Sequence, residues 1–216
     1  MNIENLKKAE ACFLQRYPDG FLDPEMVAIG KKHKMLKMID LSRDLFRREN
    51  FARPHTIVVH LAKIISASSM VSMFEKPKFR SFAAALDLLE QELLCRGLEE
   101  QLYGDQHQGF EMMLDVLQSR KMAKWTLMSI TPVYFKPEDE VFVKPTTAKG
   151  IIKYLELDEL DYKPQPSWGF YSLFRDTINE LKTRVDPGLS PSNAAFTGFL
   201  MMSLGTNQAV NKIKGR

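Results

Sequence analysis

The chain has few of the residues that bind metals or form disulfides. Its 216 residues include two cysteines and four histidines. Cys12 and Cys95 form no Cys-x-x-Cys pair and no zinc-binding spacing, so we expect free, inert thiols in a reducing compartment. His55 and His60 are five residues apart, which is about 140° around a helix, so they cannot share a metal ion. The sequence therefore indicates no metal site and no cofactor.

A long hydrophobic segment is also lacking. The amino terminus, Met1–Lys8, is polar and charged where a secretory signal peptide has an apolar stretch. The uncharged run Pro187–Asn211 contains an apolar part, Ala194–Leu204, of about half the roughly 20 residues that cross a bilayer. We therefore expect a cytoplasmic protein without a membrane span, with a buried helix at Ala194–Leu204.

Catalytic signatures are missing as well. The chain contains no Gly-x-Ser-x-Gly nucleophile elbow, no Gly-x4-Gly-Lys-Ser/Thr phosphate loop and no His-Glu-x-x-His pair. Glu140 and Lys144 have the wrong spacing for the Glu-x-Lys unit of metal nucleases. An enzyme of unrecognised type, whose reacting residues converge from distant parts of the chain, stays an open alternative.

What is present is the composition of a folded helical protein. Hydrophobic residues make up 44% and charged residues 26% of the chain, which are ordinary fractions for a globular domain. Apolar residues recur with helical spacing over most of the length. We expect a mainly α fold, with a single multi-helix globular domain over residues 1–205. A weak subdomain border near residue 121 and a flexible tail over residues 206–216 complete this prediction.

Capping residues and prolines divide the first half into helices. Asn2 and Asp105 are expected to cap helices, and Asp23-Pro24 is expected to start one, because Asp caps and Pro suits the first helical position. The spacing predicts a loop around Lys76-Pro77 and then one long helix that carries Phe82–Leu94.

The second half is less regular. The apolar run Trp125–Phe135 is compatible with a strand or with a buried helix, because periodicity does not separate the two in short apolar runs. A turn at Pro137–Asp139 is followed by a minor β element near Val141–Val143. Thr146 or Thr147 is then expected to cap a helix, and further helices follow over Trp168–Val185 and Ala194–Leu204.

The segment Lys144–Gly150 carries the sharpest functional hypothesis. Two lysines and two threonines surround its predicted helix start, and helix starts are natural anion sites because their N–H groups are free. We hypothesise that a phosphate or carboxylate binds there, with two further Lys-Pro lysines nearby. The alternative is that a threonine caps the helix and the lysines are solvated. The candidate residues are Lys136, Lys144, Thr146, Thr147, Lys149 and Lys163.

Aromatic residues begin the next predicted helix, directly after Pro164 and Pro166. Trp168 and Tyr171 are candidates for the wall of a pocket beside the lysines. The alternative is that they belong to the core, where aromatic side chains contribute much of the buried area.

A second group of cations lies in the first quarter of the chain. A basic helical face holds phosphates, and each neutralised phosphate adds salt-sensitive affinity. The face lacks interleaved exposed aromatics, which proteins that bind single strands use for base stacking. A solvated helix face is the alternative to a nucleic-acid face. The candidate residues are Lys31, Lys32, Lys34, Lys37, Arg47 and Arg48.

Three segments resemble those of an uncharacterised family of bacterial proteins: Ser69–Arg80, Ala123–Lys149 and Ser190–Leu204. The resemblance covers nearly the whole chain and is strongest at the sequence VFVKPTTAKG, Val141–Gly150. It implies a cytoplasmic bacterial protein and transfers no activity, cofactor or catalytic residue.

The leading prediction is a non-catalytic binding or interaction protein with an anion site at Lys144–Lys149. The second is a nucleic-acid-associated accessory protein that uses the basic face. The partners that fit these predictions are a phosphorylated small molecule, a nucleic acid or another protein, and no membrane.

Overall fold

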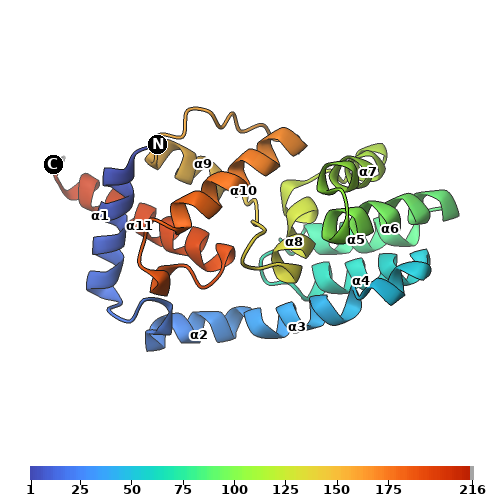
Figure 1. Cartoon of the computed structure of the whole chain (residues 1–216), viewed down its shortest axis with the longest axis horizontal. Helices are drawn as coiled ribbons and strands as arrows, with labels where there is room; N and C mark the ends of the chain where they lie inside the picture. Colours follow the sequence, from blue (N-terminus) through green and yellow to red (C-terminus); the bar gives the residue numbers. More distant parts are fainter. Residues whose placement is uncertain (215–216) are drawn as a thin grey trace.

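Helices form wherever the apolar residues recur with helical spacing, and they account for nearly all the regular structure. The computed structural model describes residues 1–214, with side chains up to Leu204 (Figure 1). No β-strand occurs in residues 1–214. The α-helices are α1 (Ile3–Arg16), α2 (Pro24–His33), α3 (Met35–Leu45), α4 (Pro54–Ala67), α5 (Glu75–Ala84), α6 (Leu88–Tyr103), α7 (Gln106–Ser119), α8 (Trp125–Phe135), α9 (Pro145–Tyr154), α10 (Trp168–Lys182) and α11 (Asn193–Lys214).

The predicted caps of the first half are confirmed. The side chain of Asn2 accepts a hydrogen bond from the Asn5 N–H (2.9 Å), and the side chain of Asp105 accepts one from the Gln108 N–H (3.0 Å). Asp23 caps α2 in the same way, with Pro24 in the first turn. These carboxylate and amide oxygens satisfy N–H groups that have no acceptor within the helix.

The apolar run Trp125–Phe135 is a helix, α8, and ten of its residues are buried. It packs against α3, α4, α6 and α7 (Figure 1). A helix that is covered on all sides is apolar around its whole circumference. This explains why its sequence has no helical periodicity and left a strand open as an alternative.

The predicted β element near Val141–Val143 is wrong. These residues are buried and extended, but no other described segment pairs with them as a strand. The Val143 N–H donates instead to the hydroxyl of Ser129 on α8 (3.0 Å). Burial in an extended segment selects the same β-branched and aromatic residues as a strand does, so the composition was misleading.

Two other predictions near the middle of the chain are wrong. Lys76 and Pro77 lie in the first turn of α5 rather than in a loop, because proline is tolerated where no N–H needs an acceptor. The expected single long helix is interrupted before α6. There Asp87 and Glu90 form a reciprocal capping box, with bonds of 2.9 and 3.0 Å.

The last helix continues past the end expected from the sequence. α11 runs to Lys214 rather than stopping at Leu204. The flexibility predicted for residues 206–216 stays a prediction, and residues 215–216 lie outside the described part of the chain. Among the described helices, none combines the length and the apolar character that a bilayer crossing requires.

All the helices share one hydrophobic core, but they pack in two groups. Helices α3 to α8 contact one another, whereas α11 contacts α1, α9 and α10. The chain passes from the first group to the second through residues 136–144, whereas the sequence suggested a weak border near residue 121. α2 and α3 lie end to end along one edge and are joined by Lys34, which has a left-handed backbone (φ 53°) (Figure 1).

The closest helix pair, α6 and α7, meets at two glycines. A Cβ atom added to Gly109 would lie 2.3 Å from the Gln101 nitrogen and 2.5 Å from the Gly97 oxygen. Both contacts are with backbone, which a side-chain rotation does not relieve. The absence of a side chain at Gly109 is therefore what lets the two helices touch.

We expect Gly109→Ala to lower the free energy of unfolding by about 3 kcal/mol, because the added methyl group pushes α6 and α7 apart. Gly169→Ala on α10 is the matched control, since an added Cβ meets nothing within 4 Å there. It should stabilise the helix by about 0.5 kcal/mol. Urea unfolding followed by circular dichroism measures both changes, and equal values for the two variants would contradict the packing described here.

Candidate functional site

The predicted anion site lies at the start of α9. Lys144 is the N-cap residue and Pro145 the first helical residue, and Lys144 makes no capping side-chain bond to the described residues. The prediction that Thr146 or Thr147 caps the helix is wrong, because Pro145 places both threonines inside the first turn. The Thr147 hydroxyl donates to the sulfur of Met201 (3.5 Å). The first turn therefore keeps N–H groups that no side chain up to Leu204 satisfies.

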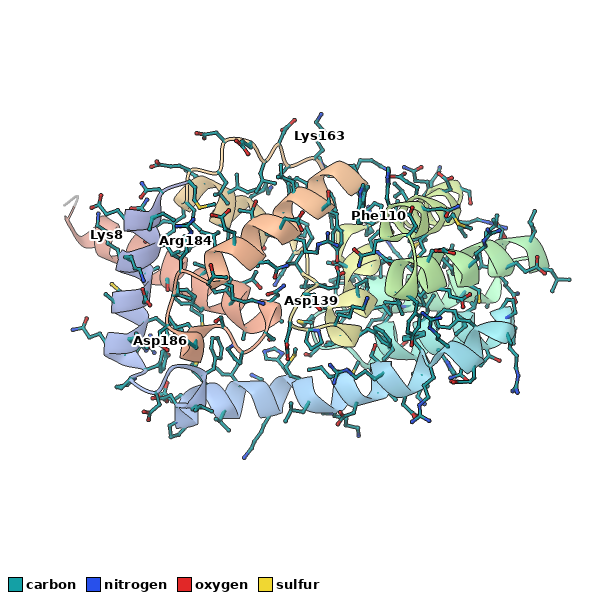
Figure 2. All side chains as sticks on the ribbon, viewed as in Figure 1. Lys8, Phe110, Asp139, Lys163, Arg184 and Asp186 are labelled. Atoms are coloured by element: carbon teal, nitrogen blue, oxygen red, sulfur yellow. The ribbon has the colours of Figure 1, made fainter. Side chains whose placement is uncertain are left out.

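The four candidate lysines do not meet at one point. The Trp125 indole N–H, at the start of α8, donates to the Lys163 carbonyl (2.7 Å). Lys136 follows the other end of the same helix, about 16 Å away along its axis. Lys163 pairs with Asp161 (3.3 Å) and projects from the edge of the molecule (Figure 2). Lys149 lies over the Tyr162 ring (5.6 Å).

Lys144 and Lys149 therefore stand as exposed cations at the start of α9, and Lys136 and Lys163, near opposite ends of α8, do not both join them. No described residue adds a buried polar group to this start that would mark a formed site. The anion site at α9 stays a prediction.

The two candidate aromatic residues lie against α7 rather than beside the lysines. Trp168 stacks on His107, with ring centres 5.5 Å apart and planes 11° apart, and the Arg175 guanidinium lies 5.5 Å from its centre. Tyr171 is buried and stacks on Phe110 (5.5 Å). The structure thus places Tyr171 in the core.

Tyr171 belongs to a buried polar network that the sequence did not predict. Its hydroxyl donates to Glu140 Oε2 (2.7 Å), and the Gln106 amide donates to Glu140 Oε1 (2.7 Å). Arg175 donates to Gln106 (2.6 Å) and lies 3.5 Å from Glu140 Oε1. Glu140 is only 3% exposed. Burial first, and then the Glu140 charge, hold the pKa of Tyr171 well above its usual value.

This network joins three separate parts of the chain. Gln106 begins α7, Glu140 precedes the extended buried segment, and the tyrosine and arginine lie on α10. The single signal in the sequence was an acidic residue directly before the apolar residues Val141–Val143. Both carboxylate oxygens of Glu140 have a partner, and the side chain is almost completely buried. We call this network, which holds α7, Glu140 and α10 together, the clamp.

Removal of the Tyr171 hydroxyl should be costly, because it leaves a buried carboxylate with one donor fewer. We expect Tyr171→Phe to reduce the free energy of unfolding by about 2 kcal/mol. The control is Tyr162→Phe, since the Tyr162 hydroxyl makes no hydrogen bond with the described residues; its change should stay within about 0.5 kcal/mol. Urea unfolding at neutral pH compares them, and a Tyr171→Phe protein as stable as the control would refute the clamp.

The histidines and cysteines do not form a reactive cluster. In the described part of the chain, no three His, Cys, Asp or Glu side chains group as metal ligands would. Cys95 is buried, its thiol donates to the Phe51 carbonyl (3.5 Å), and burial raises its pKa to about 11. Cys12 is exposed, so of the two thiols only Cys95 is protected by burial.

The predicted basic face lies on the α2–α3 rod. We define the basic face as the exposed cations between residues 31 and 48. Two of them have partners: Arg47 pairs with Asp44 (2.7 Å), and Arg48 lies over the Tyr103 ring (4.7 Å). Arg43, which the prediction did not include, also donates to the Phe135 carbonyl (3.3 Å). The face consists of Lys31, Lys32, Lys34, Lys37, Arg43, Arg47 and Arg48.

Positive charge is concentrated in residues 31–48, which run from the last turn of α2 through α3 to two arginines just beyond it. The seven cations and two aspartates between residues 31 and 48 leave a net charge of +5, although the whole chain carries only +3. The other 198 residues therefore carry a net charge of −2. The small net charge of the whole chain therefore does not reveal that residues 31–48 are strongly basic.

Comparisons with known proteins found no relative of this chain. A scan against models of protein families found no match, and neither the curated proteins nor the solved structures gave one. The resemblance to an uncharacterised bacterial family stays a prediction, and a function has to be inferred from the side chains themselves.

Proposed function

We propose that this chain is a non-catalytic protein that binds nucleic acid through the basic face of α2 and α3. The observation that carries the proposal is the charge of residues 31–48, which run from the end of α2 to just past α3: +5 within 18 residues, against −2 on all the others. The cations are exposed, so their charge is available to a ligand. Such a surface favours a polyanion over a neutral partner.

The shape of the face favours a linear ligand. From Lys31 to Leu45, where α3 ends, the rod extends for about 21 Å at the helical rise per residue. A single phosphate occupies only a small part of that length, whereas a nucleic acid presents one charge after another along it. Asp40 and Asp44 interrupt the row, and the pairing of Asp44 with Arg47 removes one cation from it. We therefore place the main contacts on the lysines at the α2–α3 junction.

The proposal predicts binding that weakens steeply with salt. Replacement of Lys31, Lys32 and Lys37 by alanine should lower the affinity for oligonucleotides at least tenfold at 50 mM salt. It should also reduce the slope of log affinity against log salt by about 2 to 3, since each lysine that neutralises a phosphate contributes about one. Fluorescence anisotropy with labelled oligonucleotides measures both.

The matched control carries the same charge change elsewhere, with Lys7, Lys8 and Lys153 replaced by alanine. These lysines are also exposed, but they lie on α1 and α9. The control should bind like the unaltered protein. Absence of binding to any oligonucleotide at low salt would rule the proposal out, as would equal losses in the two triple variants.

A second candidate, a small anion at the start of α9, rests on the uncapped first turn beside Lys144 and Lys149. Titration calorimetry with inorganic phosphate and nucleotides should show binding that Lys144→Ala/Lys149→Ala weakens about tenfold. The control Lys31→Ala/Lys32→Ala should leave it unchanged, because those exposed lysines lie on α2. Equal binding by both double variants, or none by the unaltered protein, would dispose of this candidate.

A further inference from the structure

A loop from another part of the chain lies against the basic face. It connects α4 to α5, and we call Ser69–Phe74 the apolar loop. The Ser69 hydroxyl and the His33 ring nitrogen Nδ1 are 2.9 Å apart. His33 lies between Lys32 and Lys34, so this hydrogen bond fixes the loop beside the lysines at the α2–α3 junction.

The tip of the apolar loop exposes two large side chains. Met73 and Phe74 are each 82% exposed, whereas the aromatic rings of the core are almost completely buried. Contact of this ring with a ligand would remove apolar surface from water, which is favourable. The five residue steps from Ser69 to Phe74 span at most about 18 Å. Phe74 therefore lies closer to Ser69 than the length of the α2–α3 rod.

The backbone around Phe74 is held in place. The Phe74 N–H donates to the Ser72 hydroxyl (3.2 Å), and the Glu75 N–H donates to the Ser72 carbonyl (3.1 Å). Glu75 in turn accepts a bond from the Thr126 hydroxyl on α8 (2.9 Å). The ring therefore projects from an anchored turn at the start of α5, which lowers the entropy cost of a contact with a ligand.

The charges near Phe74 have the same sign as the basic face. Lys76, Lys78 and Arg80 follow on α5, and Lys78 and Arg80 are exposed. The acidic residue next to the ring, Glu75, already accepts bonds from Ser72 and Thr126. An exposed ring among cations matches a ligand that carries both negative charge and flat apolar surfaces.

We infer that the preferred ligand is single-stranded nucleic acid, and that Phe74 stacks on one of its bases while the basic face holds its phosphates. This inference rests on the proposed function and specifies its ligand. The flat faces of the bases are accessible in a single strand, whereas pairing and stacking cover them in a duplex. Phe74 supplies the exposed aromatic that the basic helices themselves lack.

A lipid surface is the competing ligand, because apolar side chains among cations also insert into anionic bilayers. Two observations favour the nucleic acid. Most of the cations are spread along two helices that lie end to end, and such an elongated surface follows a strand better than a plane. The apolar tip also consists of two adjacent residues only, a small insertion for a membrane anchor.

The test compares Phe74→Ala and Phe74→Trp in the full chain. Phe74→Ala should weaken binding to a 20-nucleotide oligothymidine about tenfold, because one base loses its stacking partner. It should leave the affinity for a duplex of the same length, and the salt slope for both ligands, unchanged. Phe74→Trp should bind like the unaltered protein, and stacking of a base should quench its indole fluorescence.

The control is Leu88→Ala on α6, which removes an equally exposed apolar side chain (79%) and should change neither affinity. If the three-lysine variant loses binding while Phe74→Ala binds oligothymidine normally, the inference falls and the proposed function stands. If no oligonucleotide binds, both fall. The inference would be overturned in favour of lipid if the protein bound phosphatidylserine vesicles but not oligothymidine, and if Phe74→Ala lost the binding to vesicles.

Discussion

The burial of one carboxylate governs how the two helix groups fit together. Glu140 enters the core where the chain crosses between the groups, and an ionised carboxylate is stable there only with a full set of donors. Gln106, Tyr171 and Arg175 supply them. Because these donors come from α7 and α10, a shift of either helix would break the set. The carboxylate therefore specifies the position of α10 against the first group.

The crossing segment around that carboxylate is irregular, yet its backbone is satisfied. The Asn193 N–H donates to the Pro137 carbonyl (2.8 Å), and the Asn179 amide donates to the Asp139 carbonyl (2.9 Å). Lys182 donates to the Glu138 carbonyl and to the Asn193 side chain. Pro137 is buried, so its carbonyl needs such a partner, whereas Glu138 and Asp139 are exposed. The backbone carbonyls of the turn Pro137–Asp139 are thus bound by α10 and α11. The carboxylates of Glu138 and Asp139 make none of these hydrogen bonds.

Local signals predicted local structure, and tertiary contacts account for the rest. Helix caps such as Asn2 and Asp105 act within four residues, so the sequence reveals them. For α8 the sequence left both a strand and a buried helix open, because a fully covered helix has no polar face. Glu140 lies more than 30 residues from Gln106, Tyr171 and Arg175, and spacing alone does not show that they meet. The exposure of the basic face followed from its composition, whereas its meeting with the apolar loop depends on one bond between His33 and Ser69.

The separation of charge along the molecule has a kinetic consequence. Residues 31–48 carry +5 and the remainder −2, so the charge of the chain is unevenly distributed as well as slightly positive. In the field of a polyanion such a molecule rotates its positive side toward the polyanion before contact. Encounters in the opposite orientation are disfavoured by repulsion. Electrostatic steering of this kind raises the rate of association more than it slows dissociation. A polyanion would therefore begin to orient the whole protein from about a Debye length away.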